Sequence, residues 1–256
     1  MPAATLPLLN LSVPVSRDLL RVPNWKRILD VGLIVVLSPL LVPLMALIAL
    51  FIKLVSRGPV LFRQERLGHL RQPFVCLKFR TMAHGADPAL HANHWRELLA
   101  RGAPMRKLDG EGDARLIRFG GFLRTMGLDE LPQLFNTLRG EMSLVGPRPC
   151  IGYELDNYHS WMLERFNVLP GLTGLWQVSG KNKTTFAEMV RLDVRYVRNQ
   201  SPGMDLRIIL RTVPTLLGQF FEALRAKWNR ATKARRTVPS EASGGTTDGT
   251  LVSDRA

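Results

Sequence analysis

The stretch GLDELPQLFNTLRGEMSLVGPRP, residues 127–149, decides how this chain is organised. It begins with two adjacent carboxylates, Asp129 and Glu130, and it ends on a rigid turn in which Arg148 stands between two prolines. The apolar residues between these ends recur at helical spacing: Leu128, Leu131, Leu134, Phe135 and Leu138. This spacing predicts a short amphipathic helix with one apolar face to bury.

Pro132 limits where this helix can begin, because proline is tolerated only in the first turn. Asp129 is therefore expected at or next to the N-cap, where the helix dipole and the unpaired backbone N–H groups favour an ionised carboxylate. Cationic side chains that can hold anions occur nearby in the sequence: Arg118, Arg124, Arg139 and Arg148. The pattern favours a nucleophilic carboxylate beside a phosphate-binding site.

The composition points to an anionic partner. The chain has 256 residues, and its 35 basic and 21 acidic residues give a net charge of +14. Such a charge favours nucleic acid, a phospholipid surface or phosphorylated substrates. The apolar residues are concentrated rather than spread, which argues against an ordinary soluble nucleic-acid-binding protein. The two cysteines, Cys76 and Cys150, do not make a disulfide framework and are expected to be reduced and inert.

One stretch near the N-terminus is apolar enough to enter a membrane. No charged residue occurs between Asp30 and Lys53, and a helix needs about 20 apolar residues to cross the hydrocarbon. Ser38 and Pro39 interrupt this helix near its middle, with Pro43 one turn later. Both flanks are basic, so the positive-inside tendency favours keeping both ends in the cytoplasm. We infer a kinked re-entrant helix; a straight span is the alternative, since proline is not rare in membrane helices.

The residues after this helix change to an alternating pattern. Segments 59–66 and 74–80 read as two strands joined around Gly68, which predicts a β-hairpin. Lys78 and Arg80 share one face of the second strand. Two cations on a strand face are usually only solvated, but beside a carboxylate nucleophile they can equally hold a diphosphate.

Further helices are predicted over residues 153–166, 185–198 and 204–228. The last is amphipathic and is expected either to pack into the core or to lie in the lipid interface. His91 and His94 lie one turn apart on another predicted helix, and a structural metal there is a minor alternative.

These patterns predict an α/β, helix-rich fold. It would consist of a re-entrant membrane helix and one cytoplasmic-facing globular domain with a small β-hairpin and interfacial amphipathic helices. The expected boundaries are a mobile segment over 1–22, the membrane helix over 23–57, the globular domain over 58–228 and a disordered basic tail over 229–256.

Seven motifs, in their order along the chain, resemble those of the bacterial sugar transferase family, the monotopic polyprenyl-phosphate glycosyl-1-phosphate transferases. The motifs are KRILD (26–30), SP (38–39), GPVLFRQERLG (58–68), KFRTM (78–82), LRTMGLDELPQLFNTLRGEMSLVGPRP (123–149), PGLTGLWQVSGKN (170–182) and DVRYV followed by an aspartate (193–205). Within the family, the chain most resembles the short members that prime exopolysaccharide synthesis.

The resemblance implies a reaction in which hexose 1-phosphate passes from a UDP-sugar to undecaprenyl phosphate, giving undecaprenyl-diphosphate-hexose and UMP. It implies that Asp129 is the nucleophile and forms an aspartyl-phosphosugar intermediate. It also implies Mg²⁺ as the cofactor, with Asp129 and Glu130 as the metal site. The phosphate-binding residues are then expected to be Arg148, Lys78, Arg80 and Arg124.

The resemblance also implies a location and a specificity. The enzyme would lie in the bacterial inner membrane, in contact with its lipid, with the catalytic domain facing the cytoplasm and with no nucleic-acid partner. Glucose or galactose is favoured as the hexose, and a homodimer is plausible. The chain departs from the family at Gly127, where many members have Ser or Thr, and in a longer, more basic tail. It also lacks the multi-span N-terminal extension of the larger members.

Two other function classes stay open on the residues alone. In a non-enzymatic membrane scaffold, a basic face would recruit an acidic partner, and Asp129 and Glu130 would be only a solvated helix N-cap. A nucleic-acid-binding protein is a weaker alternative, because the chain has a long uncharged run and no recognised nucleic-acid motif.

Overall fold

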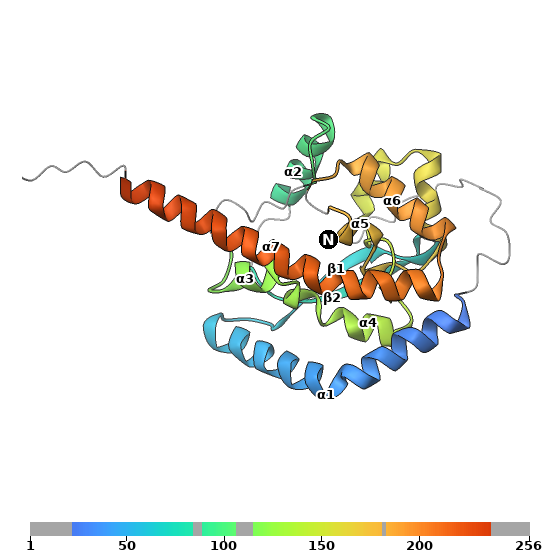
Figure 1. The fold of residues 1–256 in the computed structure, drawn as a ribbon, viewed down its shortest axis with the longest axis horizontal. Coiled ribbons are helices and arrows are strands. Elements are labelled where there is room, and N and C mark those ends of the chain that lie inside the picture. The colour runs from blue at the N-terminus through green and yellow to red at the C-terminus, as the bar shows by residue number, and fades with distance from the viewer. Residues whose placement is uncertain (1–21, 84–88, 106–114, 181–182, 237–256) are drawn as a thin grey trace, which may run out of the picture.

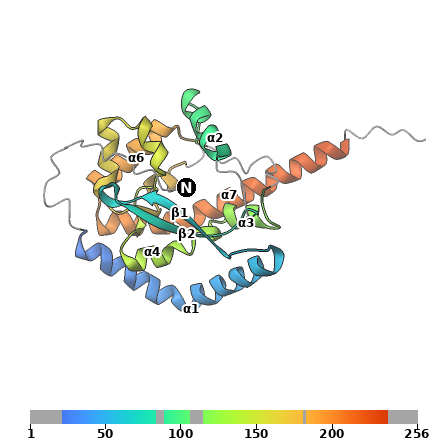
Figure 2. The same cartoon turned by 180° about the vertical axis from the view of Figure 1, so that it is seen from behind.

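A computed structural model describes residues 22–83, 89–105, 115–180 and 183–236 of the protein. In Figure 1, α1 (Asn24–Val55) runs along one side of a body of short helices and strands, and α7 (Pro202–Arg236) runs across that body. Figure 2 shows from behind that α7 projects beyond this body. The predicted mobile segment lies almost wholly outside the described residues. The tail was predicted to begin at residue 229, but α7 continues to Arg236.

Helix α1 is bent near its middle (Figure 1), where it contains Pro39 and Pro43. Pro39 has no N–H, so the carbonyl of Val35, four residues earlier, loses its usual partner. The Ser38 hydroxyl donates to that carbonyl at 2.8 Å. The helix therefore continues through the break that the sequence predicted, with a side chain replacing the missing backbone donor.

Both arms of α1 pack against the same body. Lys26, Asp30 and Ile34 are buried on the first arm, Ile48 and Ile52 on the second, and no residue of α1 between Ile34 and Ile48 is buried. Within the described part of the chain, α1 is the one helix long and apolar enough to cross a membrane, and 11% of its apolar window is buried. A core helix of a soluble protein would bury most of that window. The middle of α1 is thus an apolar surface that the body leaves uncovered.

A buried ionic network attaches the first arm of α1. Lys26 Nζ lies 2.5 Å from Asp205 Oδ2 and 2.9 Å from the Tyr196 hydroxyl, which donates to Asp205 Oδ1 at 2.7 Å. One turn later in α1, Asp30 accepts hydrogen bonds from the Ser143 hydroxyl and from the Leu144 N–H, both at 3.0 Å. Burial of such charges is tolerated only when they are paired, so these contacts fix where α1 begins.

The predicted hairpin is confirmed. Strand β1 (Leu61–Leu67) pairs antiparallel with β2 (Pro73–Phe79), and a short 3₁₀ turn, η2 (His69–Arg71), joins them. The turn opens at Gly68, whose N–H donates to the Gln72 carbonyl at 2.9 Å.

A second, smaller sheet was missed by the sequence analysis. Strand β3 (Ser143–Val145) pairs in parallel with β4 (Gly171–Thr173). Three residues are too few for an alternating pattern to register. The pairing depends instead on two glycines, since a Cβ built on Gly171 would lie 2.0 Å from the backbone N of Gly146.

The helix predicted over 153–166 is wrong as a single element. The structure has two 3₁₀ segments there, η5 (Gly152–Asn157) and η6 (Ser160–Asn167), with extended backbone at Tyr158 and His159 between them. Tyr158 stacks on Phe186, with ring centroids 5.3 Å apart. The break in the helix therefore coincides with this packed ring, which helical spacing does not reveal.

The other helices complete the body. The prediction over 185–198 is confirmed as α6 (Phe186–Arg198), where Thr185 and Glu188 form a capping box. The remaining short helices are α2 (Ala89–Ala100), α3 (Gly120–Thr125), η4 (Leu128–Glu130), α4 (Gln133–Arg139) and α5 (Leu175–Val178).

Two helices turn apolar side chains outward. Helix α4 was predicted to bury its apolar face, but it buries Gln133, Asn136 and Thr137 together with Leu134, whereas Phe135 and Leu138 are exposed. The exposed apolar residues of α7 recur at helical spacing: Leu206, Leu210, Val213, Leu217, Phe221 and Leu224. This stripe is an exposed apolar face, and the placement of α7 in a lipid interface stays a prediction.

Candidate active site

The two carboxylates lie in the 3₁₀ turn η4, directly before α4. Gly127 precedes this turn with φ at +67°, a left-handed conformation that glycine adopts without strain. Asp129 was predicted at or next to the N-cap of the following helix, but Pro132 occupies the N-cap of α4, three residues after Asp129, and no side chain caps this helix. Asp129 is nevertheless only 4% exposed, so a carboxylate is held inside the protein just outside the helix.

The amide of Asn136 places α4 against the hairpin. Its Oδ1 accepts from the Leu77 N–H at 3.0 Å, and its Nδ2 donates to the Val75 carbonyl at 2.7 Å. These backbone groups belong to β2, so Asn136 bonds to that strand as a neighbouring strand would. Nδ2 also donates to Glu141 at 2.6 Å. Because α4 must bury this amide, its polar face is turned inward.

Lys78 and Glu130 meet as a consequence. Lys78 Nζ lies 3.2 Å from Glu130 Oε1, and the two side chains are 22% and 25% exposed. A half-buried pair of this kind is open to a ligand. The structure therefore brings one of the predicted phosphate-binding cations next to the predicted carboxylate pair.

Arg148 is held rigidly on its turn. Its guanidinium lies 3.3 Å from both carboxylate oxygens of the buried Glu154. Burial acts to lower the pKa of Arg148, but the Glu154 carboxylate raises it above its ordinary value, so the side chain stays charged. Arg165 donates to the Arg148 carbonyl at 2.7 Å and Arg66 to the Pro149 carbonyl at 2.9 Å.

Cys76 is a buried residue of β2, two residues before Lys78. Burial raises the pKa of Cys76, and the charged side chains that act on it most are Lys78, Arg66, Glu130 and Arg148. Burial also raises the pKa of Cys150 to about 11. Both thiols are free in the structure, and protonated buried thiols are poor nucleophiles.

Arg80 and Arg124 each donate hydrogen bonds to groups outside the carboxylate pair. Arg80 is 5% exposed and donates to the carbonyls of Arg57 and Ser56, at 2.5 and 2.9 Å, where α1 ends. Arg124 donates to the Thr81 hydroxyl at 3.5 Å. In this structure Arg80 secures the second arm of α1, and phosphate binding by these two arginines stays a prediction.

The donor set suits magnesium. No group of three or more His, Cys, Asp or Glu side chains in the described residues could hold a metal ion. Asp129 and Glu130 offer hard oxygen ligands, and Mg²⁺ is often held by one or two carboxylates together with substrate phosphates. A site completed by a diphosphate ligand is compatible with this pair.

Sequence reasoning missed the residues that support the site. Asn136, Glu154 and Arg165 carry no spacing signal, because each acts through a polar contact with a residue outside its own helix. Arg66 could have been singled out from its motif with Gln64, to which its guanidinium also donates at 2.7 Å.

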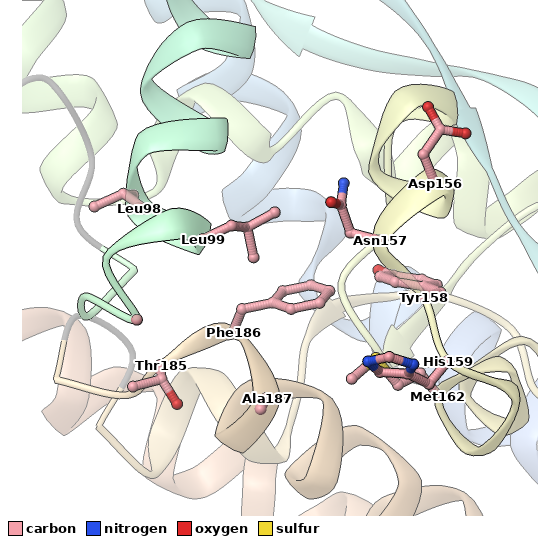
Figure 3. A pocket seen from close by; sticks show the side chains of 11 residues that line it. Leu98, Leu99, Asp156, Asn157, Tyr158, His159, Met162, Thr185, Phe186 and Ala187 are labelled. Atoms are coloured by element: carbon pink, nitrogen blue, oxygen red, sulfur yellow. The ribbon is translucent and has the colours of Figure 1, made fainter.

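A separate pocket of about 540 Å³ opens between α2, η5 and the start of α6 (Figure 3). Leu99, Tyr158 and Phe186 line it, with polar groups at its edge such as Asn157 and His159. None of the predicted site residues lines it. The Tyr158 hydroxyl accepts a hydrogen bond from Arg165, so one wall is linked to the arginine that holds the Arg148 turn.

Comparison with known proteins matches residues 22–219 to the family described as bacterial sugar transferase. The chain is 41% identical over 200 residues to the exopolysaccharide production protein ExoY of Rhizobium meliloti, covering 75% of this chain and 84% of that protein. It is 44% identical to the UDP-glucose:undecaprenyl-phosphate glucose-1-phosphate transferase of Caulobacter vibrioides, covering 75% and 69%. It is 36% identical to the undecaprenyl-phosphate galactose phosphotransferase of Salmonella typhimurium, covering 81% and 42%.

Proposed function

Since the chain belongs to the bacterial sugar transferase family, we propose that it transfers hexose 1-phosphate from a UDP-sugar to undecaprenyl phosphate by way of an aspartyl-phosphosugar. It is a phosphoglycosyl transferase, as its relatives' names indicate, and its short ExoY-like relatives connect it with exopolysaccharide synthesis. The names of these relatives include both glucose and galactose, and we propose that the hexose is one of these two.

One observation carries the proposal: a nearly buried Asp129 adjoins the Lys78–Glu130 pair. Partial exclusion of water favours a carboxylate nucleophile in two ways. It reduces the hydration of the carboxylate, and it protects the acyl phosphate that the carboxylate forms from hydrolysis. Arg148, kept charged by Glu154, adds a planar fork of donors suited to phosphate.

The proposed reaction has two displacements. Asp129 attacks the phosphorus that carries the sugar, the bond from this phosphorus to the bridging oxygen breaks, and UMP leaves with that oxygen. An oxygen of undecaprenyl phosphate then attacks the same phosphorus, and the Asp129 carboxylate is released. Lys78 and Arg148 would orient the phosphates and balance their charge.

We propose that Asp129 and Glu130 also hold Mg²⁺. When bound, the ion neutralises charge on the diphosphate. Glu130 would then share its carboxylate between the metal and Lys78, which lies 3.2 Å away.

We propose that α1 enters one leaflet of the inner membrane and returns to the cytoplasmic side. Both of its arms contact the same body, and the apolar middle is uncovered. The exposed apolar residues of α7 and α4 would rest in the interface beside it. A polyprenyl phosphate keeps its charged head at that surface, so the site needs this fixed depth.

The activity is tested by measuring UMP. Purified protein in membrane vesicles is expected to release UMP from UDP-glucose or UDP-galactose when undecaprenyl phosphate is present, with EDTA suppressing release and Mg²⁺ restoring it. UDP-N-acetyl sugars serve as the comparison. Absence of release from every UDP-sugar in the panel would leave the membrane-scaffold alternative in its place.

The topology is tested by labelling single cysteines with a membrane-impermeant maleimide. Pro23→Cys and Pro59→Cys lie at exposed positions on either side of α1, and the two native thiols are buried. Both new thiols are expected to react in inverted inner-membrane vesicles and to be protected in intact spheroplasts. Reaction from opposite sides would establish a straight span.

A further inference from the structure

The turn η4, which carries Asp129 and Glu130, directly precedes α4, so its position depends on that of α4. Helix α4 is too short to be stable alone. It has seven residues and no side-chain N-cap, and isolated helices shorter than about 12 residues are marginal in water. Its place must therefore come from contacts with other elements. Figures 1 and 2 both show α4 lying between α1 and the hairpin.

The contact with α1 is made by Arg27. Its Nη1 donates to the Thr137 carbonyl at 2.6 Å and its Nη2 to the Leu138 carbonyl at 3.0 Å. These carbonyls belong to the last turn of α4, where a cation is favourably placed; the Thr137 carbonyl also accepts from the Gly140 N–H at 3.0 Å. Arg27 of α1 thus bonds to the C-terminal end of α4.

The contact with the hairpin is made by Asn136. Its amide bonds both to Leu77 N–H and to the Val75 carbonyl, and Leu77 immediately precedes Lys78. The side chain is fully buried. Any shift of α4 along β2 would break these two hydrogen bonds and leave buried polar groups unpaired, which is unfavourable.

On the basis of the proposed function, we propose that Arg27 and Asn136 are positioning residues for the transfer reaction. Asn136 sets the register of α4 against β2 and so brings Glu130 to Lys78. Arg27 ties the same helix to the membrane anchor and so fixes the depth of Asp129 relative to the lipid phosphate. The anchor is then part of the catalytic framework as well as an attachment to the bilayer.

The obvious other role of Arg27 is to bind a lipid headgroup, as basic residues at membrane surfaces do. A headgroup needs only a positive charge, whereas two neighbouring carbonyls need the planar fork of a guanidinium. Arg27→Lys separates the two roles, because lysine keeps the charge and loses the fork.

The test compares Arg27→Lys, Arg27→Gln and Asn136→Asp with Arg101→Gln, a matched control at an exposed position directly after α2. We expect kcat for UMP release to fall about 10- to 100-fold in the first three, since a displacement near 1 Å can cost that much. KM for the UDP-sugar and association with vesicles are expected to change less than about threefold, and Arg101→Gln to stay near wild type.

A double-mutant cycle separates positioning from a general loss of stability. In a Lys78→Met background, Asn136→Asp is expected to lower kcat by less than about threefold, because the pair that it positions is already absent. The cycle is measured at a temperature where circular dichroism shows both variants folded. If Asn136→Asp proves too unstable to purify, Arg27→Lys is combined with Lys78→Met in its place.

Three results would overturn the proposal. The first is full activity of Arg27→Lys. The second is an equal decrease in kcat from Asn136→Asp in the wild-type and Lys78→Met backgrounds. The third is an Arg27→Gln variant that loses vesicle binding but keeps its kcat. Wild-type protein that releases no UMP would instead refute the proposed function. Active wild type with unimpaired variants refutes only the positioning roles.

Discussion

Asp129→Asn is expected to abolish UMP release while leaving the protein folded and bound to membranes. The amide has nearly the shape of the carboxylate, so the 4% exposed site is kept. It lacks the anionic oxygen that must attack phosphorus, and removal of a covalent nucleophile lowers kcat by roughly 10⁴-fold or more. The measurement is UMP release by the purified variant in vesicles containing undecaprenyl phosphate.

Trapping the intermediate makes this prediction specific. Wild-type protein incubated with UDP-sugar labelled in the hexose, without acceptor, is expected to retain label on the peptide that contains Asp129. Asp156→Asn, at an exposed position on η5, is the matched control and should be labelled normally. Activity of Asp129→Asn above a few per cent of wild type would remove this residue as the nucleophile.

Gly171→Ala is expected to prevent stable folding. The added Cβ would lie 2.0 Å from the backbone N of Gly146 and 2.4 Å from the Thr173 carbonyl oxygen. Both neighbours are backbone, so no side chain can move aside and the two segments must separate. Separation breaks the Gly171 N–H bond to the Pro147 carbonyl, at 2.8 Å, beside Arg148. A loss above about 4 kcal/mol is expected, which exceeds what most single substitutions cause.

Thermal unfolding followed by circular dichroism, together with limited proteolysis, measures this effect. Gly218→Ala in α7 is the matched control, because nothing lies within 4 Å of the Cβ it would add. Alanine is favoured over glycine inside a helix by about 1 kcal/mol, so the control should be unchanged or slightly stabilised. If Gly171→Ala unfolds at the same midpoint temperature as wild type, the close contact between β3 and β4 does not contribute to stability, and this prediction is wrong.

Much of the fold could be predicted from the sequence because its signals are local. The apolar run of α1 with its break at Ser38 and Pro39, the alternation of the hairpin and the capping residues of α6 all depend on neighbours in the chain. The inverted burial of α4 could not be predicted, because the spacing of its leucines identifies an apolar face and does not say what covers it.

The site divides in the same way. The motif from Gly127 to Pro149 singled out Asp129, Glu130 and Arg148. The sequence did not distinguish the roles of two cations outside this motif: Lys78, which contacts Glu130, and Arg80, which bonds to the end of α1. The sequence predicts both cations on one face of one strand, two residues apart, whereas β2 ends at Phe79, directly before Arg80. Only the neighbours of each side chain separate their roles.

The sequence by itself determined that this protein has an apolar helix with a proline break, a hairpin and a carboxylate pair in a transferase motif, because residue types at fixed spacing encode each of them. Only the tertiary structure decided that both arms of that helix return to one body, that Asn136 and Arg27 hold α4 in place, and that Lys78 reaches Glu130. These arrangements depend on buried polar groups finding partners far away in the chain, and a pairing across tens of residues leaves no periodic trace.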